Sequence, residues 1–171
     1  DPGVSAPGSR GPVLGTNPIA WAVPDGSGTT IFLDIATSVT AAGKIYKAQA
    51  EGKTIPEGWL IDGEGLPTTD PSGYPKTGAL MPMAGHKGFG LALLVEILTG
   101  LISGGAIGGE VTSWVRGPEP VNQSLSFIAI DIGAFMPIEA FTSRISKLAL
   151  EIRQAPKAVG VAVEEHDARL A

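Results

Sequence analysis

A glycine-rich turn at residues 85–90, Gly-His-Lys-Gly-Phe-Gly, carries the two polar side chains of His86 and Lys87. The glycines lack a Cβ, so the backbone can turn tightly and approach a ligand closely. Residues 89–101 are almost entirely apolar, and we expect them to form a helix buried in the core. The free N–H groups of its first turn favour an anionic ligand such as a phosphate. The alternative is a glycine turn before a core helix, with Lys87 merely solvated.

Two more polar groups lie near the start of the chain. Thr16 and Asn17 precede Pro18 in a turn, where short polar side chains can bond the backbone or a ligand. The alternative is an ordinary turn. Asp34 ends a segment rich in β-forming residues, and its carboxylate could cap the next helix or orient a catalytic group. Capping is the commoner use, and Ser38 competes for it.

Hydrophobic periodicity predicts the elements that position these groups. We expect strands at residues 20–23, 30–34 and 125–131, with a further one possible at 159–163. We expect helices at residues 38–50, 89–101 and 137–154, and a long loop at residues 53–78. The first helix should end near Gly52, and Pro137 suits the first position of the last helix. The last helix should bury one apolar stripe, made of Ile138, Phe141, Ile145, Leu148 and Ile152.

The composition is that of a globular domain. Of the 171 residues, 43% are hydrophobic and 17% are charged, and the net charge of −5 argues against binding nucleic acid or an anionic membrane. The sequence has no cysteine and two histidines, and the acidic loop lacks the ligand spacing of an EF-hand, so we predict no metal site. His166 is expected to be a solvated tail residue. We expect a cytoplasmic protein whose sequence starts inside a longer polypeptide.

The common ligand-binding and catalytic motifs are missing from the sequence. It has no Gly-x-Gly-x-x-Gly between a strand and a helix, no Gly-x-Ser-x-Gly elbow and no phosphate-binding P-loop. The residues alone therefore indicate an α/β domain with a glycine turn that could accept an anion.

Five motifs follow one another along the sequence: Leu-Gly-Thr-Asn-Pro-Ile-Ala (14–20), Leu-Asp-Ile-Ala-Thr-Ser (33–38), Ile-Pro-Glu-Gly-Trp (55–59), Pro-Thr-Thr-Asp-Pro (67–71) and Gly-His-Lys-Gly-Phe-Gly-Leu-Ala-Leu (85–93). In this order they resemble the malate/L-lactate dehydrogenase family of the non-Rossmann type. Its relatives include ureidoglycolate dehydrogenase, diketogulonate reductase, sulfolactate dehydrogenase and piperideine-2-carboxylate reductase. The resemblance runs from about residue 10 to about residue 155. It covers the family's cofactor-binding part and C-terminal helix, so the family's N-terminal portion, roughly its first half, is expected to be absent here.

The resemblance implies an α/β fold with a non-Rossmann, sheet-containing NAD(P)-binding domain and flanking helices. Residues 1–13 would be a linker, residues 14–135 the cofactor-binding domain, and residues 136–171 a C-terminal helix and tail. The family interconverts 2-hydroxy acids and 2-oxo acids, or related imines, with NAD or NADP. It forms homodimers or larger homo-oligomers, and no nucleic-acid or membrane partner is expected.

The resemblance also implies roles for single residues. In the family, the motif matched by residues 16–19 lies along the cofactor. The lysine of the glycine turn, matched by Lys87, reaches the dinucleotide. The cofactor-binding residues would be Thr16, Asn17, Pro18, Ile19, His86 and Lys87.

For catalysis, the resemblance points to Asp34, which matches an acid that in some members belongs to a relay orienting the catalytic histidine. That histidine lies in the absent portion and matches neither His86 nor His166, so little turnover is expected from this chain alone. Ser124 and Leu125 stand where the family commonly has Gly and His, and the usual C-terminal Pro-Gly-Glu is missing. The alternative function is a non-catalytic assembly domain, or a remnant without cofactor affinity.

Overall fold

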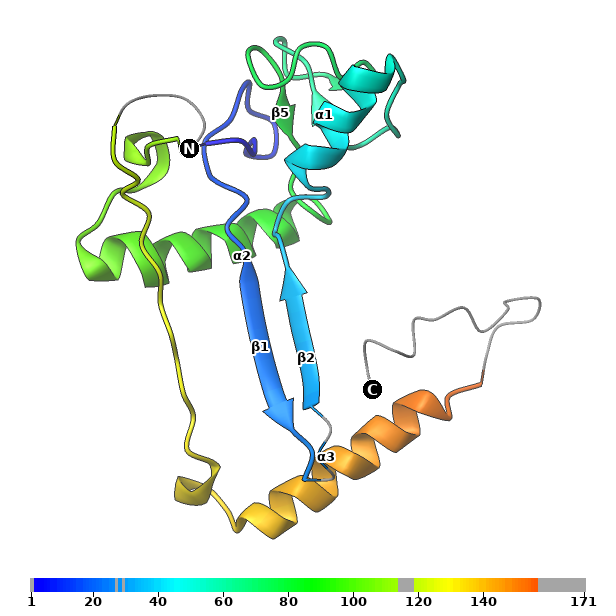
Figure 1. The fold of residues 1–171 in the computed structure, drawn as a ribbon, viewed down its shortest axis with the longest axis vertical. Coiled ribbons are helices and arrows are strands. Elements are labelled where there is room, and N and C mark those ends of the chain that lie inside the picture. The colour runs from blue at the N-terminus through cyan, green and yellow to red at the C-terminus, as the bar shows by residue number, and fades with distance from the viewer. Residues whose placement is uncertain (1, 27, 29, 114–118, 157–171) are drawn as a thin grey trace. The chain divides into compact units, whose positions relative to one another are not determined.

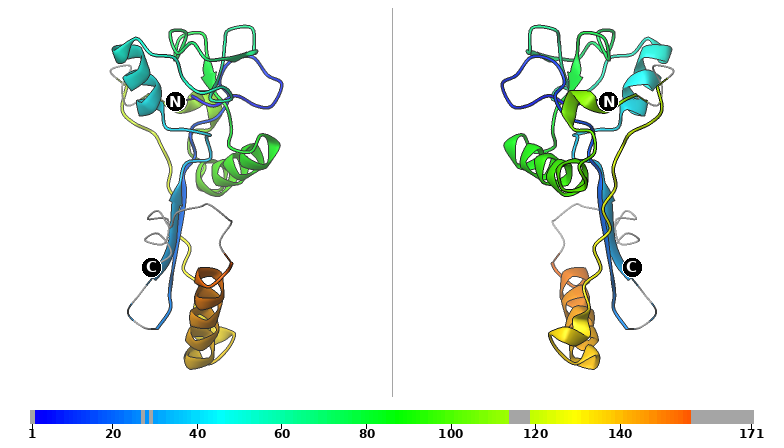
Figure 2. Two further views of the ribbon diagram at one scale, coloured as in Figure 1. Left: turned by 90° about the vertical axis from the view of Figure 1, so that its right-hand side faces the viewer. Right: turned by 90° about the vertical axis from the view of Figure 1, so that its left-hand side faces the viewer.

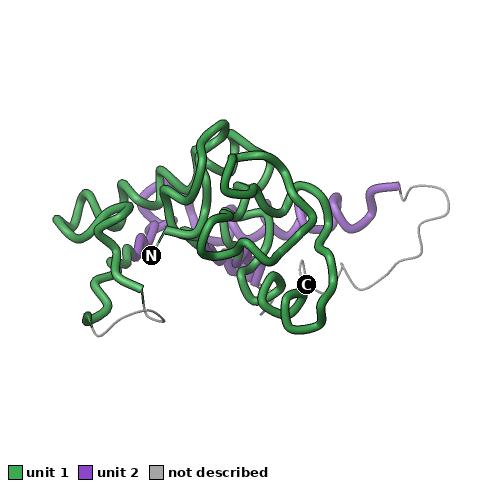
Figure 3. Tube along the Cα trace, turned by 90° about the horizontal axis from the view of Figure 1, so that it is seen from above, with its two compact units in different colours: residues 1–19, 35–126 green, residues 20–34, 127–171 purple. Residues whose placement is uncertain are grey.

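The structure is a computed structural model that describes residues 2–26, 28, 30–113 and 119–156 (Figure 1). The chain divides into two compact units (Figure 3). Unit 1 contains residues 1–19 and 35–126, and unit 2 contains residues 20–34 and 127–171. Together the helices and small sheets give the α/β fold expected from the sequence. The domain boundaries predicted from the sequence stay a prediction.

Unit 1 contains a three-stranded antiparallel sheet, and two of its strands lie within residues 53–78, the region predicted to be a long loop. Its strands are β3 (Leu60–Ile61), β4 (Pro67–Thr68) and β5 (Ala79–Leu80), in the order β4-β3-β5. Leu60 lies opposite Thr68 on one side and Leu80 on the other. The loop prediction was wrong here because strands of two residues are too short to show an alternating pattern.

The first helix, α1 (Ala42–Glu51), packs on this sheet through the fully buried Ile45. It begins four residues later than predicted because the preceding residues are held in an extended conformation. Ser38 forms a β-bridge with Pro82, and the Val39 N–H donates to the Met81 carbonyl. The helix ends as predicted, at Gly52, whose φ of 62° is left-handed.

Part of the predicted linker belongs to this core. Val4 is completely buried and forms β-bridges with Leu14 and Leu80. The Ser5 N–H donates to the Leu80 carbonyl, and the Leu80 N–H donates to the Gly3 carbonyl, at 2.9 Å each. The sequence alone did not show this because one valine among Pro, Gly and Ser residues makes no periodic pattern.

The glycine turn leads into α2 (His86–Glu96), which continues as one π-helical turn (Ile97–Leu101). The prediction that this helix is buried was wrong. Its buried residues are Gly88, Ala92 and Gly100, whereas its large apolar side chains are mostly exposed, among them Leu91, Leu93, Leu94, Ile97 and Leu101. Because the helix is apolar on all sides, a core that covers one side leaves the others open.

Unit 2 includes most of β1 (Ile19–Pro24) and β2 (Thr30–Ile35), which lie side by side (Figures 1 and 2), and α3 (Ile138–Arg153). The two strands and the helix confirm the prediction to within one residue at each end. Pro137 immediately precedes α3 instead of occupying its first position. Within the predicted stripe, Phe141 and Ile145 are half-buried, but Ile138, Leu148 and Ile152 are exposed.

The strand predicted at residues 125–131 is not formed. These residues have no assigned secondary structure, and Leu125, Phe127, Ile128 and Ile130 are each more than two-thirds exposed. A strand needs a neighbour for its N–H and C=O groups, and no strand of the described chain pairs with this segment. The other possible strand, at 159–163, and His166 lie outside the described residues. No described helix is long and apolar enough to cross a membrane.

Candidate functional site

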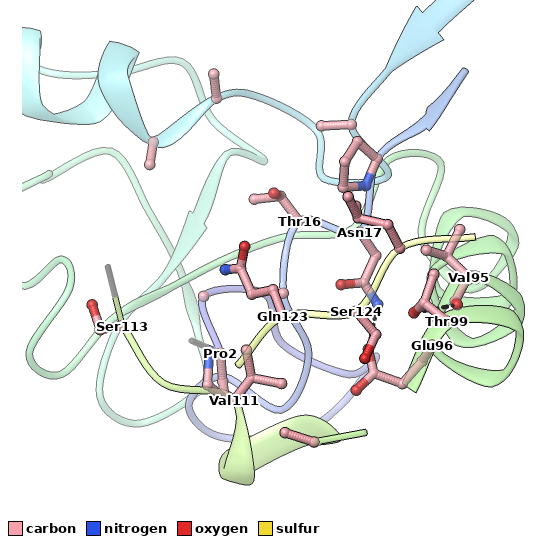
Figure 4. Close-up of a pocket in the computed structure, with 18 of the residues that line it drawn as sticks. Pro2, Thr16, Asn17, Val95, Glu96, Thr99, Val111, Ser113, Gln123 and Ser124 are labelled. Carbon is pink, nitrogen blue, oxygen red and sulfur yellow. Dashed lines mark hydrogen bonds between the residues drawn. The ribbon is translucent and has the colours of Figure 1, made fainter. Parts of the chain in front are cut away.

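Unit 1 contains a cavity of about 510 Å³ that brings together Thr16, Asn17 and Pro18 with residues far from them in sequence. Figure 4 shows ten of the lining residues by name. Polar groups come from the helix α2, its π-helical turn and a later segment, namely Glu96, Thr99, Gln123 and Ser124. Small residues leave space between them, namely Gly3, Gly15, Ala36, Ala41, Ala42 and Ala106.

Asn17 attaches its wall of the cavity to α2. Its side-chain amide donates to the Ala92 carbonyl at 2.9 Å and to Glu96 Oε2 at 2.8 Å. Its φ of 34° lies in the left-handed region, which Asn tolerates better than most residues do. The ordinary turn that was the alternative for this motif therefore does not describe Asn17, because its side chain is bonded across 75 or more residues.

Glu96 connects the same wall to a third segment. While Oε2 accepts from Asn17, Oε1 accepts from the backbone N–H of Gly108 at 2.6 Å. Gly108 begins a short 3₁₀ helix, Gly108–Glu110. Glu96 has no role predicted from the sequence, although a lone carboxylate within an apolar run is the signal that could have identified it.

Thr37 fixes the backbone of Thr16 and Asn17 by hydrogen bonds. It is completely buried, and its hydroxyl donates to the carbonyls of Thr16, at 2.9 Å, and Asn17, at 3.1 Å. Its own N–H also donates to the Thr16 carbonyl. Thr37 belongs to the motif at residues 33–38, but the sequence did not predict this role because these hydrogen bonds go to backbone carbonyls about 20 residues away.

Hydroxyl groups also line the cavity, with Thr99 drawn beside Glu96 in Figure 4. Thr99 lies in the π-helical turn and donates to the Val95 carbonyl at 2.8 Å. Single π-helical turns are often found at functional sites. Ser124 lines the cavity and accepts from Ser103 Oγ at 3.2 Å, so it adds a polar group to the lining.

His86 and Lys87 are exposed on the first turn of α2 and do not line the cavity. The turn before them has positive φ at two residues, 48° at Ala84 and 60° at Gly85. The predicted supply of free N–H donors is smaller than expected. The Lys87 and Gly88 N–H groups already donate to carbonyls of the turn, at 3.4 and 3.0 Å.

The two polar groups are separated along one helix. Asn17 bonds Ala92 and Glu96, which follow His86 by six and ten residues. At 1.5 Å per residue, the contacts lie about 9 to 15 Å along the axis from His86. A ligand that touches both groups must therefore extend along α2.

Ile19 and Asp34 do not line the cavity. Ile19 begins β1 and is half-buried, while Asp34 lies in β2, belongs to unit 2 and is exposed. The alternative roles of Asp34 and Ser38 as helix caps are excluded, because α1 begins after Ala41. Orientation of a histidine by Asp34 stays a prediction.

The charge of the cavity limits what it can hold. Among its described lining residues, Glu96 is the one carboxylate, and neither Lys nor Arg is present. The cavity therefore suits an uncharged group that forms hydrogen bonds better than a phosphate. No group of three or more metal-ligating side chains occurs within the described residues.

Comparison with known proteins identifies the family. The chain matches malate/L-lactate dehydrogenase over residues 1–164. It belongs to the malate/L-lactate dehydrogenase family. It is 36% identical over 155 residues to L-sulfolactate dehydrogenase from Methanothermobacter thermautotrophicus, covering 91% of this chain and 45% of that protein. It is also 36% identical over 154 residues to a Delta(1)-pyrroline-2-carboxylate/Delta(1)-piperideine-2-carboxylate reductase from Pseudomonas putida, covering 90% of this chain and 44% of the reductase.

A solved structure of the family has a similar fold. The sulfolactate dehydrogenase of Methanocaldococcus jannaschii superimposes with a TM-score of 0.84 at 37% identity. The match covers 94% of this chain and 46% of that one. This chain thus spans less than half the length of the relatives it matches.

Proposed function

We propose that this chain is the cofactor-binding portion of an NAD- or NADP-dependent oxidoreductase that interconverts 2-hydroxy acids and 2-oxo acids, or related imines. The observation that supports this most directly is the cavity, which collects Thr16, Asn17 and Pro18 in a chain of the dehydrogenase family. The paired strands of unit 1 are short and antiparallel, which fits a non-Rossmann cofactor domain better than a parallel Rossmann sheet.

The residues of unit 1 fit the two kinds of group that such a cofactor contains. The small residues of the cavity leave room, and Thr16, Gln123 and Ser124 offer hydrogen-bonding groups to an uncharged ring or ribose. The exposed Lys87 offers a positive charge to a phosphate outside the cavity. A bound nicotinamide would supply hydride transfer, while these residues would bind and orient it.

The proton-transfer part of the reaction would lie outside this chain. As the resemblance implies, Asp34 would orient a histidine supplied by another part of the enzyme. Such a carboxylate fixes the tautomer of the imidazole and stabilises its cation. We therefore expect cofactor binding, with little or no turnover, from the chain alone.

Titration with NADH and NADPH, followed by cofactor fluorescence, tests this proposal. We expect saturable binding of at least one cofactor, weakened about tenfold by Lys87→Ala because a charge-assisted hydrogen bond to phosphate is lost. Lys76→Ala is the matched control, since Lys76 is also exposed in unit 1 but lies in a different turn. Failure of the unmodified chain to bind either cofactor would contradict the proposal.

A second candidate function is a non-catalytic assembly domain. The observation that favours it is the exposed apolar surface on α2 and on residues 125–130. Exposed patches of this kind mark surfaces that a partner covers. Analytical ultracentrifugation tests it: self-association without cofactor binding would favour assembly, and a clean monomer would count against it. Association together with cofactor binding would agree with the homodimer, or larger homo-oligomer, proposed for the dehydrogenase.

A further inference from the structure

We propose that Glu96 is a positioning residue that fixes the shape of the cavity by clamping the Thr16–Asn17 wall to the segment at Gly108. The effect on cofactor binding rests on the proposed function, whereas the clamp itself can be measured without any cofactor.

The clamp joins segments that are far apart in the sequence. Glu96 lies 79 residues from Asn17 and 12 residues from Gly108. Its two oxygens accept one bond from each, at 2.8 and 2.6 Å, which are lengths typical of hydrogen bonds to a charged acceptor. One half-buried carboxylate thus connects three parts of the cavity wall.

Asn17 needs such an anchor because its backbone is in an uncommon conformation. A φ of 34° lies in the left-handed region, which costs Asn less than most residues but is still uncommon, and contacts around Asn17 fix it there. The amide oxygen of Asn17 also lies over Gly15, where an added Cβ would be 2.7 Å away. Glu96 therefore holds the Asn17 side chain in a position that is open only because residue 15 is a glycine.

Positioning explains the geometry better than proton transfer to a ligand does. Both carboxylate oxygens face N–H donors of the protein, one from a side chain and one from the backbone. A general base would instead direct an oxygen at its substrate. Glu96 acts on the ligand through Asn17 and Gly108.

Hydrogen exchange at the Gly108 amide measures the clamp directly. Glu96→Ala removes the acceptor, and we expect Gly108 to exchange about tenfold faster or more, as for the loss of a hydrogen bond to a charged group. Glu64→Ala is the matched control, because Glu64 is 71% exposed and pairs with Arg10. We expect the control to leave Gly108 unchanged.

Exchanging the amide of Asn17 and the carboxylate of Glu96 between the two positions tests the hydrogen bond that joins them. Asn17→Asp places two carboxylates together, and we expect it to weaken NADH binding and Gly108 protection. In Asn17→Asp/Glu96→Gln, the Gln amide can donate to Asp while its oxygen accepts from Gly108, so we expect partial recovery of both. Recovery on adding the second substitution would assign the loss to the interaction between the two side chains instead of to either residue alone.

The outcomes separate this proposal from the proposed function. Faster Gly108 exchange in Glu96→Ala, with recovery in the double variant, supports the clamp even if the unmodified chain binds no cofactor. The latter result would contradict the proposed function only. Unchanged Gly108 exchange in Glu96→Ala, or a double variant no better than Asn17→Asp, would overturn the clamp.

Discussion

The two ends of α2 carry polar groups of opposite character. At the C-terminal end, Asn17 and Glu96 bond each other, Asn17 also bonds the Ala92 carbonyl of α2, and Glu96 also bonds the Gly108 N–H; both side chains belong to residues that line a cavity. At the N-terminal end, His86 and Lys87 are exposed on a turn whose bonds are local and made by the backbone. One end is fixed by contacts across the fold, and the other presents exposed polar side chains, among them the cationic Lys87, to solvent.

This difference suits a ligand whose chemical groups bind at the two ends of α2 in different ways. The fixed end suits an uncharged group that must be oriented, because its hydrogen-bonding groups are already placed. The exposed end suits a phosphate, since a long cationic side chain needs little preorganisation to meet an anion. A dinucleotide contains both kinds of group, and this supports the proposed function.

The largest loss of stability that we expect comes from adding a side chain at Gly88, which lies against the turn at the N-terminal end of α2. A Cβ on Gly88 would lie 2.1 Å from the Met83 carbonyl oxygen, so Gly88→Ala must displace the turn. We expect a loss of about 3 kcal/mol in the free energy of unfolding, measured with urea.

Gly90→Ala is the control for that substitution in the same helix. A Cβ there meets nothing within 4 Å, and alanine favours a helix interior by about 1 kcal/mol over glycine. We therefore expect Gly90→Ala to be neutral or stabilising. Equal losses from both variants would mean that the turn at Met83 is not fixed.

A smaller loss should follow at the other end from Asn17→Ala. It removes the bonds to Ala92 and Glu96, and we expect a loss of about 2 kcal/mol in unfolding free energy. Asn17→Gly removes the same bonds but accepts the left-handed backbone, so it should lose about 1 kcal/mol less. If the two variants unfold alike, the φ of Asn17 carries no strain.

The sequence predicted those elements whose pattern is local. β1, β2 and α3 have runs of β-forming residues or helical periodicity long enough to recognise, and their observed bounds agree with the prediction. The end of α1 at Gly52 follows from glycine's freedom to adopt positive φ. These features need no information about distant residues.

The remaining features depend on contacts across the chain. Glu96 meets Asn17 across 79 residues, and no spacing rule connects the two. The exposure of α2 depends on what covers each side of it, which an apolar run does not specify. The motif resemblance named Thr16, Asn17 and Pro18 without revealing the Glu96 and Thr37 side chains that hold them.

Lys87→Ala, at the N-terminal end of α2, should change cofactor affinity without changing stability, unlike the substitutions of Asn17 at the other end. Lys87 is exposed, so we expect an unfolding free energy within about 0.5 kcal/mol of the unmodified chain. Its effect on cofactor affinity should shrink at high salt, because ions screen an exposed charge. Titrations at low and high NaCl measure this, and an effect independent of salt would argue against a phosphate contact.

The smallest effect we expect concerns a local turn of unit 1 that takes part in neither end of α2. The backbone N–H and the hydroxyl of Ser72 donate to Asp70 at 2.9 and 2.8 Å, and these bonds hold the pKa of Asp70 below its usual 3.8. Because the folded pKa is lowered, the stabilisation is present above pH 3.8 and is lost as the pH falls through the folded value.

Ser72→Ala separates the two bonds, since it removes the hydroxyl and keeps the backbone donor. The backbone bond is the larger cause, so the pKa of Asp70, followed by NMR titration, should rise in this variant and still remain below 3.8. Asn17→Ala should leave it unchanged, because the Asp70 turn closes on residues two positions away, whereas Asn17 bonds across the fold. A shift of the Asp70 pKa in Asn17→Ala would mean that the cavity wall and this turn are coupled, and the contrast between long-range and local fixation would then fail.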